Sequence, residues 1–166
     1  TNPEPALMSR LSHFDDEGAS RMVDVGEKAV TARTATASAR VSMEAATLTR
    51  IRDGKLEKGE VLEVARLAGI MAAKRTSDLI PLCHPIGLNS VEIAFGFPDE
   101  ATVRVEATAK TEAKTGVEME ALVAVSISAL TIYDMCKAID RSMSVDHVQL
   151  EEKSGGKSGD FRRPPA

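Results

Sequence analysis

The chain has 166 residues, of which 43% are hydrophobic, and one compact domain of this size buries about 70% of the surface that its unfolded chain exposes. Aromatic residues make up only 3% and the formal net charge is −4, which argues against a base-stacking or broadly basic surface and so against nucleic-acid binding. Any anionic ligand is therefore expected to be small, held for example by the local basic stretch KSGGKSGDFRR.

The first predicted element is a strand over residues 30–41, because Val, Thr and small residues alternate with Arg there. A short helix is expected over 42–55, with Ser42 as its N-cap and Gly54 at its end. Residues 58–75 give the clearest helical pattern, and basic residues lie at its C-terminal end, where the helix dipole favours them. Its apolar residues at helical spacing are Val61, Val64, Ala65, Ala68, Met71 and Ala72.

The second half of the chain begins with a predicted hairpin, in which a Pro-Asp turn separates the alternating runs 88–97 and 101–110. A long helix is expected from about residue 117 to 140, where Thr115 and Glu118 fit a capping box. Its Val, Ile and Thr content is typical of a strand, but a run of about 25 residues without a turn signal is too long for one. Residues 144–153 form the last predicted strand.

This order of strand, helices, strand, strand, helix and strand predicts an α+β fold of the ferredoxin-like, split βαβ type. Such a fold has an antiparallel sheet with helices packed on one face. We expect a single domain over residues 21–153. The N-terminal segment 1–20 and the Gly/Lys-rich tail 154–166 are expected to be flexible.

Cys83 and His84 stand side by side in SDLIPLCHP, a segment that two prolines keep out of a helix. In extended backbone their side chains point to opposite sides, so they are not expected to act as a nucleophile and its base. A zinc site needs three or four ligands, and no Cys-x-x-Cys element or further nearby His is present, so no metal site is predicted. His84 is either a structural histidine or a polar site residue, whereas Cys83 alone is typical of a small buried hydrophobe.

Two pairs of ionisable residues lie in the long helix. Glu118 and Glu120 fall just inside its start, where capping and the helix dipole explain acidic residues without any ligand. Asp134 and Lys137 are three residues apart on one face, and such a pair is usually an exposed ion pair of little energetic weight. In this apolar run, however, a buried acid and amine would shift each other's pKa and could carry protons.

The tail stretch EKSGGKSGDF combines Lys153 and Lys157 with three glycines, whose backbone N–H groups can approach oxyanions closely. It is not a P-loop, because Glu151 occupies the position five residues before Gly156 and no helix follows. A mobile tail and an oxyanion site both fit this composition. Lys58 likewise fits a solvated lysine ahead of a helix.

The two cysteines, Cys83 and Cys136, lie 53 residues apart in a sequence that opens with the polar stretch TNPEPALMSR. Without a basic and then apolar leader, we expect reduced thiols and a cytoplasmic location. The longest mainly apolar stretch, ALVAVSISALTIY, is shorter than a membrane span and contains serines, so no membrane association is expected.

Four blocks of the sequence together carry a resemblance to a known family, and their order and spacing make the combination specific. They are AGIMAAKRTSDLIPLCHP, KTGVEMEAL, ALTIYDMCKA and EKSGGKSGDF. From about Ser12 to Phe161 the chain resembles the cyclic pyranopterin monophosphate synthase family, the molybdenum cofactor biosynthesis protein C family. The resemblance implies a phosphorus-oxygen lyase that uses no redox cofactor. It converts the GTP-derived 3′,8-cyclo-7,8-dihydroguanosine 5′-triphosphate to cyclic pyranopterin monophosphate and diphosphate.

The resemblance also implies roles for particular residues. It places the catalytic acid/base at Asp134, with Lys137 beside it and Lys58 as a further catalytic residue. It implies substrate contacts by Leu82, Cys83, His84, Glu118, Met119 and Glu120. Basic positions suited to the triphosphate fall on Lys74, Lys153 and Lys157. It further implies a homohexamer built as a trimer of dimers.

This chemistry agrees with the residues available, since carboxylates and lysines with shifted pKa transfer protons and clustered lysines stabilise a diphosphate leaving group. Two other classes stay open. A non-catalytic nucleotide-binding module would need the same lysines but would tolerate Asp134→Asn, and a thiol hydrolase would need Cys83 or Cys136.

The long helix also predicts where a site can be assembled. Glu120 and Asp134 are 14 residues apart, or about 21 Å along one helix axis, too far for one small pocket. The helix is apolar on nearly all sides, which predicts contacts with its own sheet and with a partner helix. Antiparallel two-fold pairing would bring Glu120 near Asp134 of the partner subunit, so we predict composite sites at a dimer interface.

Overall fold

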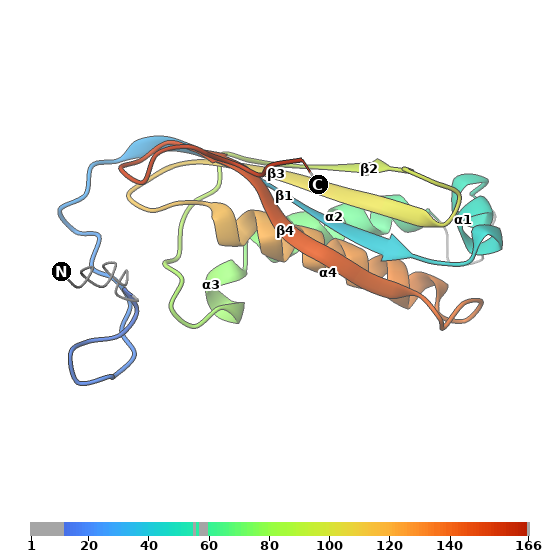
Figure 1. Cartoon of the computed structure of the whole chain (residues 1–166), viewed down its shortest axis with the longest axis horizontal. Helices are drawn as coiled ribbons and strands as arrows, with labels where there is room; N and C mark the ends of the chain where they lie inside the picture. The colour runs from blue at the N-terminus through green and yellow to red at the C-terminus, as the bar shows by residue number, and fades with distance from the viewer. Residues whose placement is uncertain (1–11, 55, 57–59, 166) are drawn as a thin grey trace, which may run out of the picture.

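An antiparallel sheet carries a layer of helices on one face in the computed structural model, which describes residues 12–54, 56 and 60–165 (Figure 1). The sheet order is β2-β3-β1-β4-β5, formed by the strands β1 Thr31–Ser42, β2 Ser90–Gly96, β3 Thr102–Ala113, β4 Ser144–Ser154 and β5 Phe161–Arg162. The helices are α1 Ala45–Arg52, α2 Val61–Ala73, α3 Thr76–Leu79 and α4 Glu118–Cys136. The predicted α+β class, the hairpin and the split βαβ order are confirmed.

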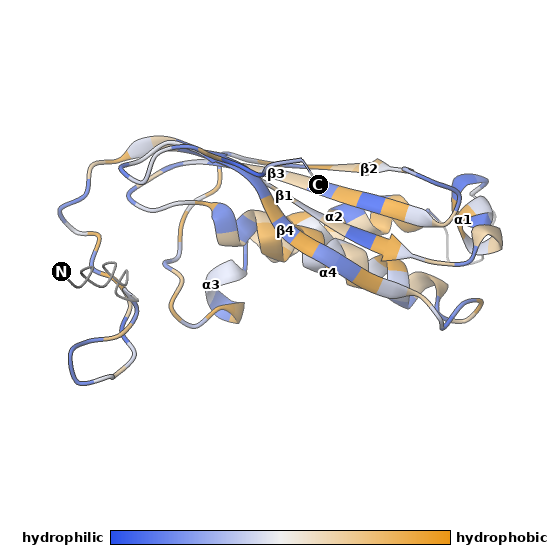
Figure 2. Ribbon diagram, in the orientation of Figure 1, coloured by the Kyte–Doolittle hydropathy of each residue, from blue (hydrophilic) through white to orange (hydrophobic). Residues whose placement is uncertain are grey.

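Small residues line the sheet face that meets the helices. Ala35, Ala37 and Ala39 of β1 are at most 1% exposed, and they pair with Ala109, Ala107 and Val105 of β3. Side chains alternate between the two faces of a strand, and Figure 2 shows this alternation of hydrophobic and hydrophilic residues along β3 and β4. Because alanine side chains are short, α4 can lie close to the sheet.

The two long helices also approach each other closely, at Gly69. A Cβ atom at this position would lie 2.8 Å from the Ser128 hydroxyl oxygen and 2.9 Å from the Ala124 carbonyl oxygen, so only glycine fits. The Ser128 hydroxyl donates a hydrogen bond of 2.6 Å to the Ala65 carbonyl. These contacts orient α2 and α4 antiparallel to each other on the sheet.

This contact changes which face of α2 is buried. The predicted apolar face included Val64 and Met71, but these side chains are 43% and 50% exposed. Of the predicted face, Val61, Ala65 and Ala72 are buried as expected. Gly69 joins them, because the close approach to α4 there leaves no room for a side chain. The outward side of α2 is consequently apolar.

The composition of α4 reflects its place in the core. The helix is long and apolar enough to cross a membrane by length and composition, yet half of its most apolar window is buried inside the protein. It packs on β1, β3 and β4 and against α2. Burial between the sheet and α2 thus explains the apolar run.

Both predicted N-caps are wrong. Ser42 is the last residue of β1, and α1 starts after Glu44, whose backbone N–H donates a 2.8 Å hydrogen bond to the Asp140 carboxylate. The Thr47 hydroxyl donates to the same carboxylate oxygen at 3.2 Å. Thr115 does not cap α4 either, since the N-cap position is Val117 and makes no side-chain cap bond. In α1 the cap comes from a residue nearly a hundred positions away.

Both terminal segments that were expected to be flexible contain residues whose backbone is hydrogen-bonded to other residues. In the tail, β5 pairs with β4, and the Arg163 amide donates a 2.7 Å hydrogen bond to the Glu151 carbonyl. Near the other end, Phe14 and Ser20 form an isolated bridge. The division of the chain into one domain and two flexible ends stays a prediction.

We expect Asp140→Ala to destabilise the protein by about 1–2 kcal/mol, because it removes the cap of α1 and the partner of Ser142. Hydrogen bonds from the Ser142 hydroxyl and the Glu44 amide lower the pKa of Asp140 below its ordinary value. The stabilisation is therefore complete above about pH 4, the pKa in the unfolded chain, and is lost as the pH falls through the lower folded-state pKa.

Urea unfolding of wild type and Asp140→Ala between pH 3 and 7 measures this difference, with Glu100→Ala, an exposed acid in the β2–β3 turn, as the matched control. A wild type and Asp140→Ala protein of equal stability at pH 7 would contradict the capping role.

Candidate active site

Two adjoining cavities open at the end of the sheet where β1 begins and where β3 and β4 end. The larger, of about 620 Å³, is called the basic cavity here. The smaller, of about 390 Å³, is called the Cys–His cavity because Cys83 and His84 line it. Both cavities are lined by Lys28, Thr115, Gly116 and Glu118. The shared residues make the two cavities neighbouring parts of one site.

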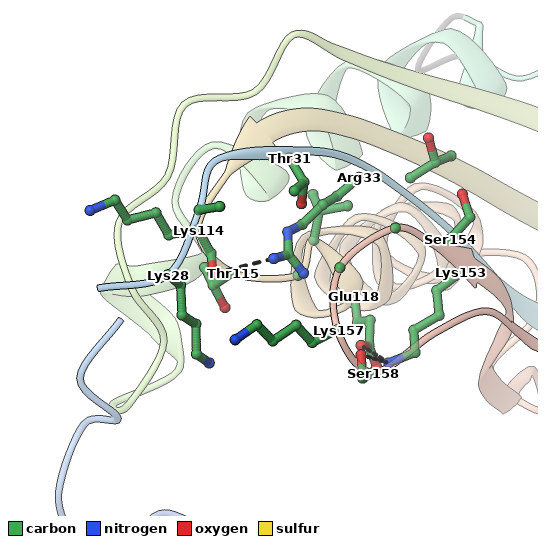
Figure 3. A pocket seen from close by; sticks show the side chains of 16 residues that line it. Lys28, Thr31, Arg33, Lys114, Thr115, Glu118, Lys153, Ser154, Lys157 and Ser158 are labelled. Carbon is green, nitrogen blue, oxygen red and sulfur yellow. Dashed lines mark hydrogen bonds and ion pairs between the residues drawn. The ribbon is translucent and has the colours of Figure 1, made fainter. Parts of the chain in front are cut away.

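Cationic side chains dominate the basic cavity (Figure 3). Its five basic residues are Lys28, Arg33, Lys114, Lys153 and Lys157, against the single carboxylate of Glu118. They come from the start of β1, the end of β3 and the end of β4, which the sheet order brings together. Figure 3 shows Lys28 and Lys157 pointing into the same space. This clustering of positive charge favours a compact polyanion.

Arg33 is held rigidly at the wall of this cavity. Its guanidinium donates hydrogen bonds of 3.1 Å to the Ala113 carbonyl and 3.3 Å to the Lys114 carbonyl. The loop after β4 passes directly over it, and a side chain at Gly156 would collide with the guanidinium. Gly155 and Gly156 have φ angles of 91° and 82°, which glycine adopts without strain. The glycines are thus required for the shape of this loop.

Lys153 joins this loop to the start of α4. Its ammonium donates a 2.9 Å hydrogen bond to the Glu118 carboxylate and a 3.2 Å hydrogen bond to the Ser158 hydroxyl. Both charged side chains are largely shielded from water, with Lys153 22% and Glu118 38% exposed. Glu118 therefore offsets the charge of Lys153, and the other cations supply the excess positive charge of the cavity.

The Cys–His cavity collects the residues of two sequence blocks. Leu82, Cys83 and His84 from the loop after α3 meet Glu118, Met119 and Glu120 from the first turn of α4. The loop is held against β3 by a 2.5 Å hydrogen bond from the Thr111 hydroxyl to the Gly87 carbonyl. All six predicted contact residues of these blocks thus surround one cavity.

Burial in this cavity shifts Glu120 and Cys83 toward their protonated forms. The Glu120 side chain is 4% exposed, and its burial raises the pKa above the ordinary value. Burial also raises the pKa of the Cys83 thiol, and the charge of Glu120 adds to this effect. Cys83 is consequently a thiol rather than a thiolate at neutral pH, which argues against a nucleophilic role. The raised pKa makes Glu120 easier to protonate than an exposed glutamate, as a general acid requires.

His84 is tied to the N-terminal part of the chain. Its Nε2 atom lies 2.7 Å from the Val23 carbonyl oxygen. Since a carbonyl only accepts, Nε2 carries the proton. Within the described residues, no group of three or more His, Cys, Asp and Glu side chains is arranged to hold a metal ion.

The predicted catalytic residues lie elsewhere. Asp134 and Lys137 form a 2.8 Å ion pair near the C-terminal end of α4, and their side chains are 63% and 51% exposed. They line neither cavity, since α4 separates Asp134 from Glu120 by about 21 Å. Lys74 is exposed at the end of α2 and also lines neither cavity. Lys58 lies outside the described residues.

Several cavity residues were missed by the sequence reasoning. In the alternating pattern of β1, Arg33 reads as a solvent-facing residue, although it is one of the few large side chains of this strand. Lys114 is the first residue of the block KTGVEMEAL, so that motif could have identified it. Lys28 had no local signal, because only the path of the N-terminal segment brings it to the cavity.

The sequence matches the model of one protein family and is closely similar to several relatives. Residues 22–156 match the sequence model of the MoaC family. A cyclic pyranopterin monophosphate synthase of Brevibacillus brevis is 54% identical over 95% of this chain and 98% of its own length. A protein of the same name in Heliobacterium modesticaldum is 59% identical over 94% of this chain and 99% of its own length. Another, in Magnetococcus marinus, is 62% identical over 94% of this chain and 96% of its own length. The family match spans β1 to β4, α4 and most residues of both cavities.

We expect inorganic diphosphate to bind the basic cavity and its affinity to fall with rising salt, because the attraction is between charges. Lys157→Met should weaken binding by about fivefold, the effect of one lost charged contact. Lys153→Met should weaken it further, since the Glu118 carboxylate would then face the anion unpaired.

Isothermal titration calorimetry checks this order, with Lys110→Met on the exposed part of β3 as the control for loss of one positive charge. Equal affinities of wild type and Lys157→Met for diphosphate would contradict this prediction and leave Lys157 without a role in anion binding.

Proposed function

The chain belongs to the MoaC family, and from this premise we propose that it is a cyclic pyranopterin monophosphate synthase of molybdenum cofactor biosynthesis. The substrate would be 3′,8-cyclo-7,8-dihydroguanosine 5′-triphosphate and the products cyclic pyranopterin monophosphate and diphosphate. The observation that carries the proposal is the junction of a basic cavity with a half-buried polar one. A nucleoside triphosphate has the same two parts.

The basic cavity is suited to the triphosphate. Closing a cyclic phosphate requires a hydroxyl to attack the phosphorus nearest the sugar while diphosphate leaves with its negative charge. Arg33, Lys157 and Lys28 would stabilise this developing charge, because fixed cations in a partly water-excluded site need no reorganisation during reaction. Lys153 and Glu118 would hold the loop over the phosphates.

The Cys–His cavity is suited to the ring system. Rebuilding the guanine-derived ring needs proton transfers on C–N and C–O bonds, and Glu120 is the buried acid at hand. Leu82, Cys83 and Met119 would contact the flat rings through apolar and sulfur atoms. The thiol hydrolase alternative loses support, since Cys136 is fully buried and burial raises the pKa of Cys83.

The remaining catalytic groups would come from a second copy of the chain. Asp134 with Lys137, and Lys58, are the proposed acid/base and its helpers, yet the first two are exposed and far from both cavities. Large apolar side chains are exposed on the outward sides of both long helices. They are Val64, Leu67 and Met71 on α2 and, one turn before Asp134, Leu130 on α4. Antiparallel pairing of α4 across these side chains would cover them and place Asp134 of the partner subunit near Glu120.

We therefore propose composite sites in a homodimer, with dimers assembled into a hexamer, and Lys74 as a further contact to the triphosphate. Neither Cys83 nor Cys136 forms a disulfide in the described part of the chain, which suits a reducing compartment, and we propose a cytoplasmic location. The non-catalytic nucleotide-binding alternative differs from this proposal in one respect: it does not need the Asp134 carboxylate.

Asp134→Ala should lower kcat by about a hundredfold or more while leaving the fold intact, because removing a general acid/base acts on the chemical step. Diphosphate release from the cyclic nucleotide measures turnover, and thermal unfolding checks the fold. Glu92→Ala, an exposed acid on β2, is the control. Near wild-type kcat in Asp134→Ala would remove this residue from the mechanism.

Mixing two inactive variants tests the composite site. When Glu120→Ala and Asp134→Ala subunits are co-assembled in equal amounts, half of the dimers are mixed and one site in each carries neither lesion. Activity should return to about a quarter of the wild-type level. If mixed dimers, isolated by two different affinity tags, stay inactive, the site lies within one chain.

A further inference from the structure

Residues 22–28, called the strap here, cross the open side of the Cys–His cavity before β1 begins. Val23 and Val25 are half-buried and line that cavity, whereas Met22 and Asp24 are exposed, as expected for extended backbone. A turn ends the strap, with the Lys28 amide donating a 3.0 Å hydrogen bond to the Val25 carbonyl. Figure 1 shows this N-terminal part of the chain leaving the sheet at the same end as α3.

Two side chains from opposite walls of the site hold the strap. His84, in the loop after α3, contacts the Val23 carbonyl through Nε2 at 2.7 Å. Lys114, just beyond β3, donates a 2.5 Å hydrogen bond to the Gly26 carbonyl through its ammonium. Both bonds end on backbone oxygens, so they fix the path of the strap whatever its side chains are.

The position of the strap affects both cavities. Val23 and Val25 form part of the wall that separates the Cys–His cavity from solvent, and Lys28 lines both cavities. With only two half-buried valines, the strap has little apolar contact of its own to keep it in place. Hydrogen bonds from outside the strap, such as those from His84 and Lys114, therefore matter for keeping it in place.

We propose that His84 and Lys114 are positioning residues that hold the strap closed over the site, which keeps water from the Cys–His cavity and keeps Lys28 at the basic cavity. The proposal rests on the proposed function, because it concerns the same site. It gives His84 a role that does not require it to exchange a proton with the substrate, since its Nε2–H group is already engaged by Val23.

Limited proteolysis of the intact protein without substrate tests the strap directly. Trypsin cleaves after Lys28 only when the strap is open, and the cleavage rate then follows the open fraction. His84→Ala and Lys114→Met should each speed this cleavage by about fivefold, the shift expected on losing one hydrogen bond. His84→Gln keeps an N–H donor near the position of Nε2 and should be cleaved like the wild type.

Two controls make the rates specific. Cleavage after Arg66, inside α2, requires unfolding of that helix, so rates after Lys28 are expressed relative to it. Lys110→Met removes one positive charge from β3 in a variant that leaves Lys114 in place, and it should not change the ratio. Unchanged ratios in both His84→Ala and Lys114→Met overturn the proposal, as does an equal rise in Lys110→Met.

Turnover of the cyclic nucleotide by the His84 variants supplies the second readout. His84→Ala should raise KM more than it lowers kcat, and His84→Gln should restore KM together with slow cleavage. If His84→Gln is cleaved as slowly as wild type but is as impaired in turnover as His84→Ala, then His84 acts on the substrate itself, and holding the strap does not account for its effect on turnover. If the wild type does not turn over the nucleotide, the proposed function fails while the cleavage result still decides whether these bonds hold the strap.

Discussion

The fit of α4 against an alanine-lined sheet is the constraint on which the rest of the structure depends. Ala35, Ala37 and Ala39 leave room for the helix to lie close to β1, and Gly69 lets α2 approach α4 equally closely. Interiors are packed so densely that a larger residue at these positions would separate the layers. The directions of both helices, and hence the places where their ends emerge, follow from these few small side chains.

A helix held in this way acts as a rigid spacer between two sets of polar groups. Its first turn carries Glu118 and Glu120 into the cavities, and its last turn carries Asp134 and Lys137 to the opposite end. Neither end can move toward the other without disrupting the core. The buried Glu120 and the exposed Asp134 thus have different surroundings in the single chain, and the composite site proposed above would need a second copy to bring them together.

The polar end of the molecule is assembled by bonds between segments that are distant in the sequence. Lys153 reaches Glu118, Arg33 reaches the Ala113 carbonyl, and His84 reaches the Val23 carbonyl. Each bond satisfies a charged or backbone group that would otherwise lose its hydration without compensation. The glycines at 155 and 156 belong to the same arrangement, because only residues without a side chain let the loop pass over Arg33.

The sequence by itself determined strands β1 to β4, the hairpin and the long helix, because periodicity depends on neighbouring residues. The grouping of Leu82–His84 with Glu118–Glu120 came from the resemblance of whole sequence blocks to a known family. Only the tertiary structure decided which groups complete those elements. Asp140 caps α1 in place of Ser42, and Val64 and Met71 of α2 stay exposed while Gly69 meets α4. Arg33 and Lys28 join the basic cavity in the same way. These choices depend on which distant segment offers the better hydrogen bond or the closer packing, and that competition is resolved only when the whole chain is folded.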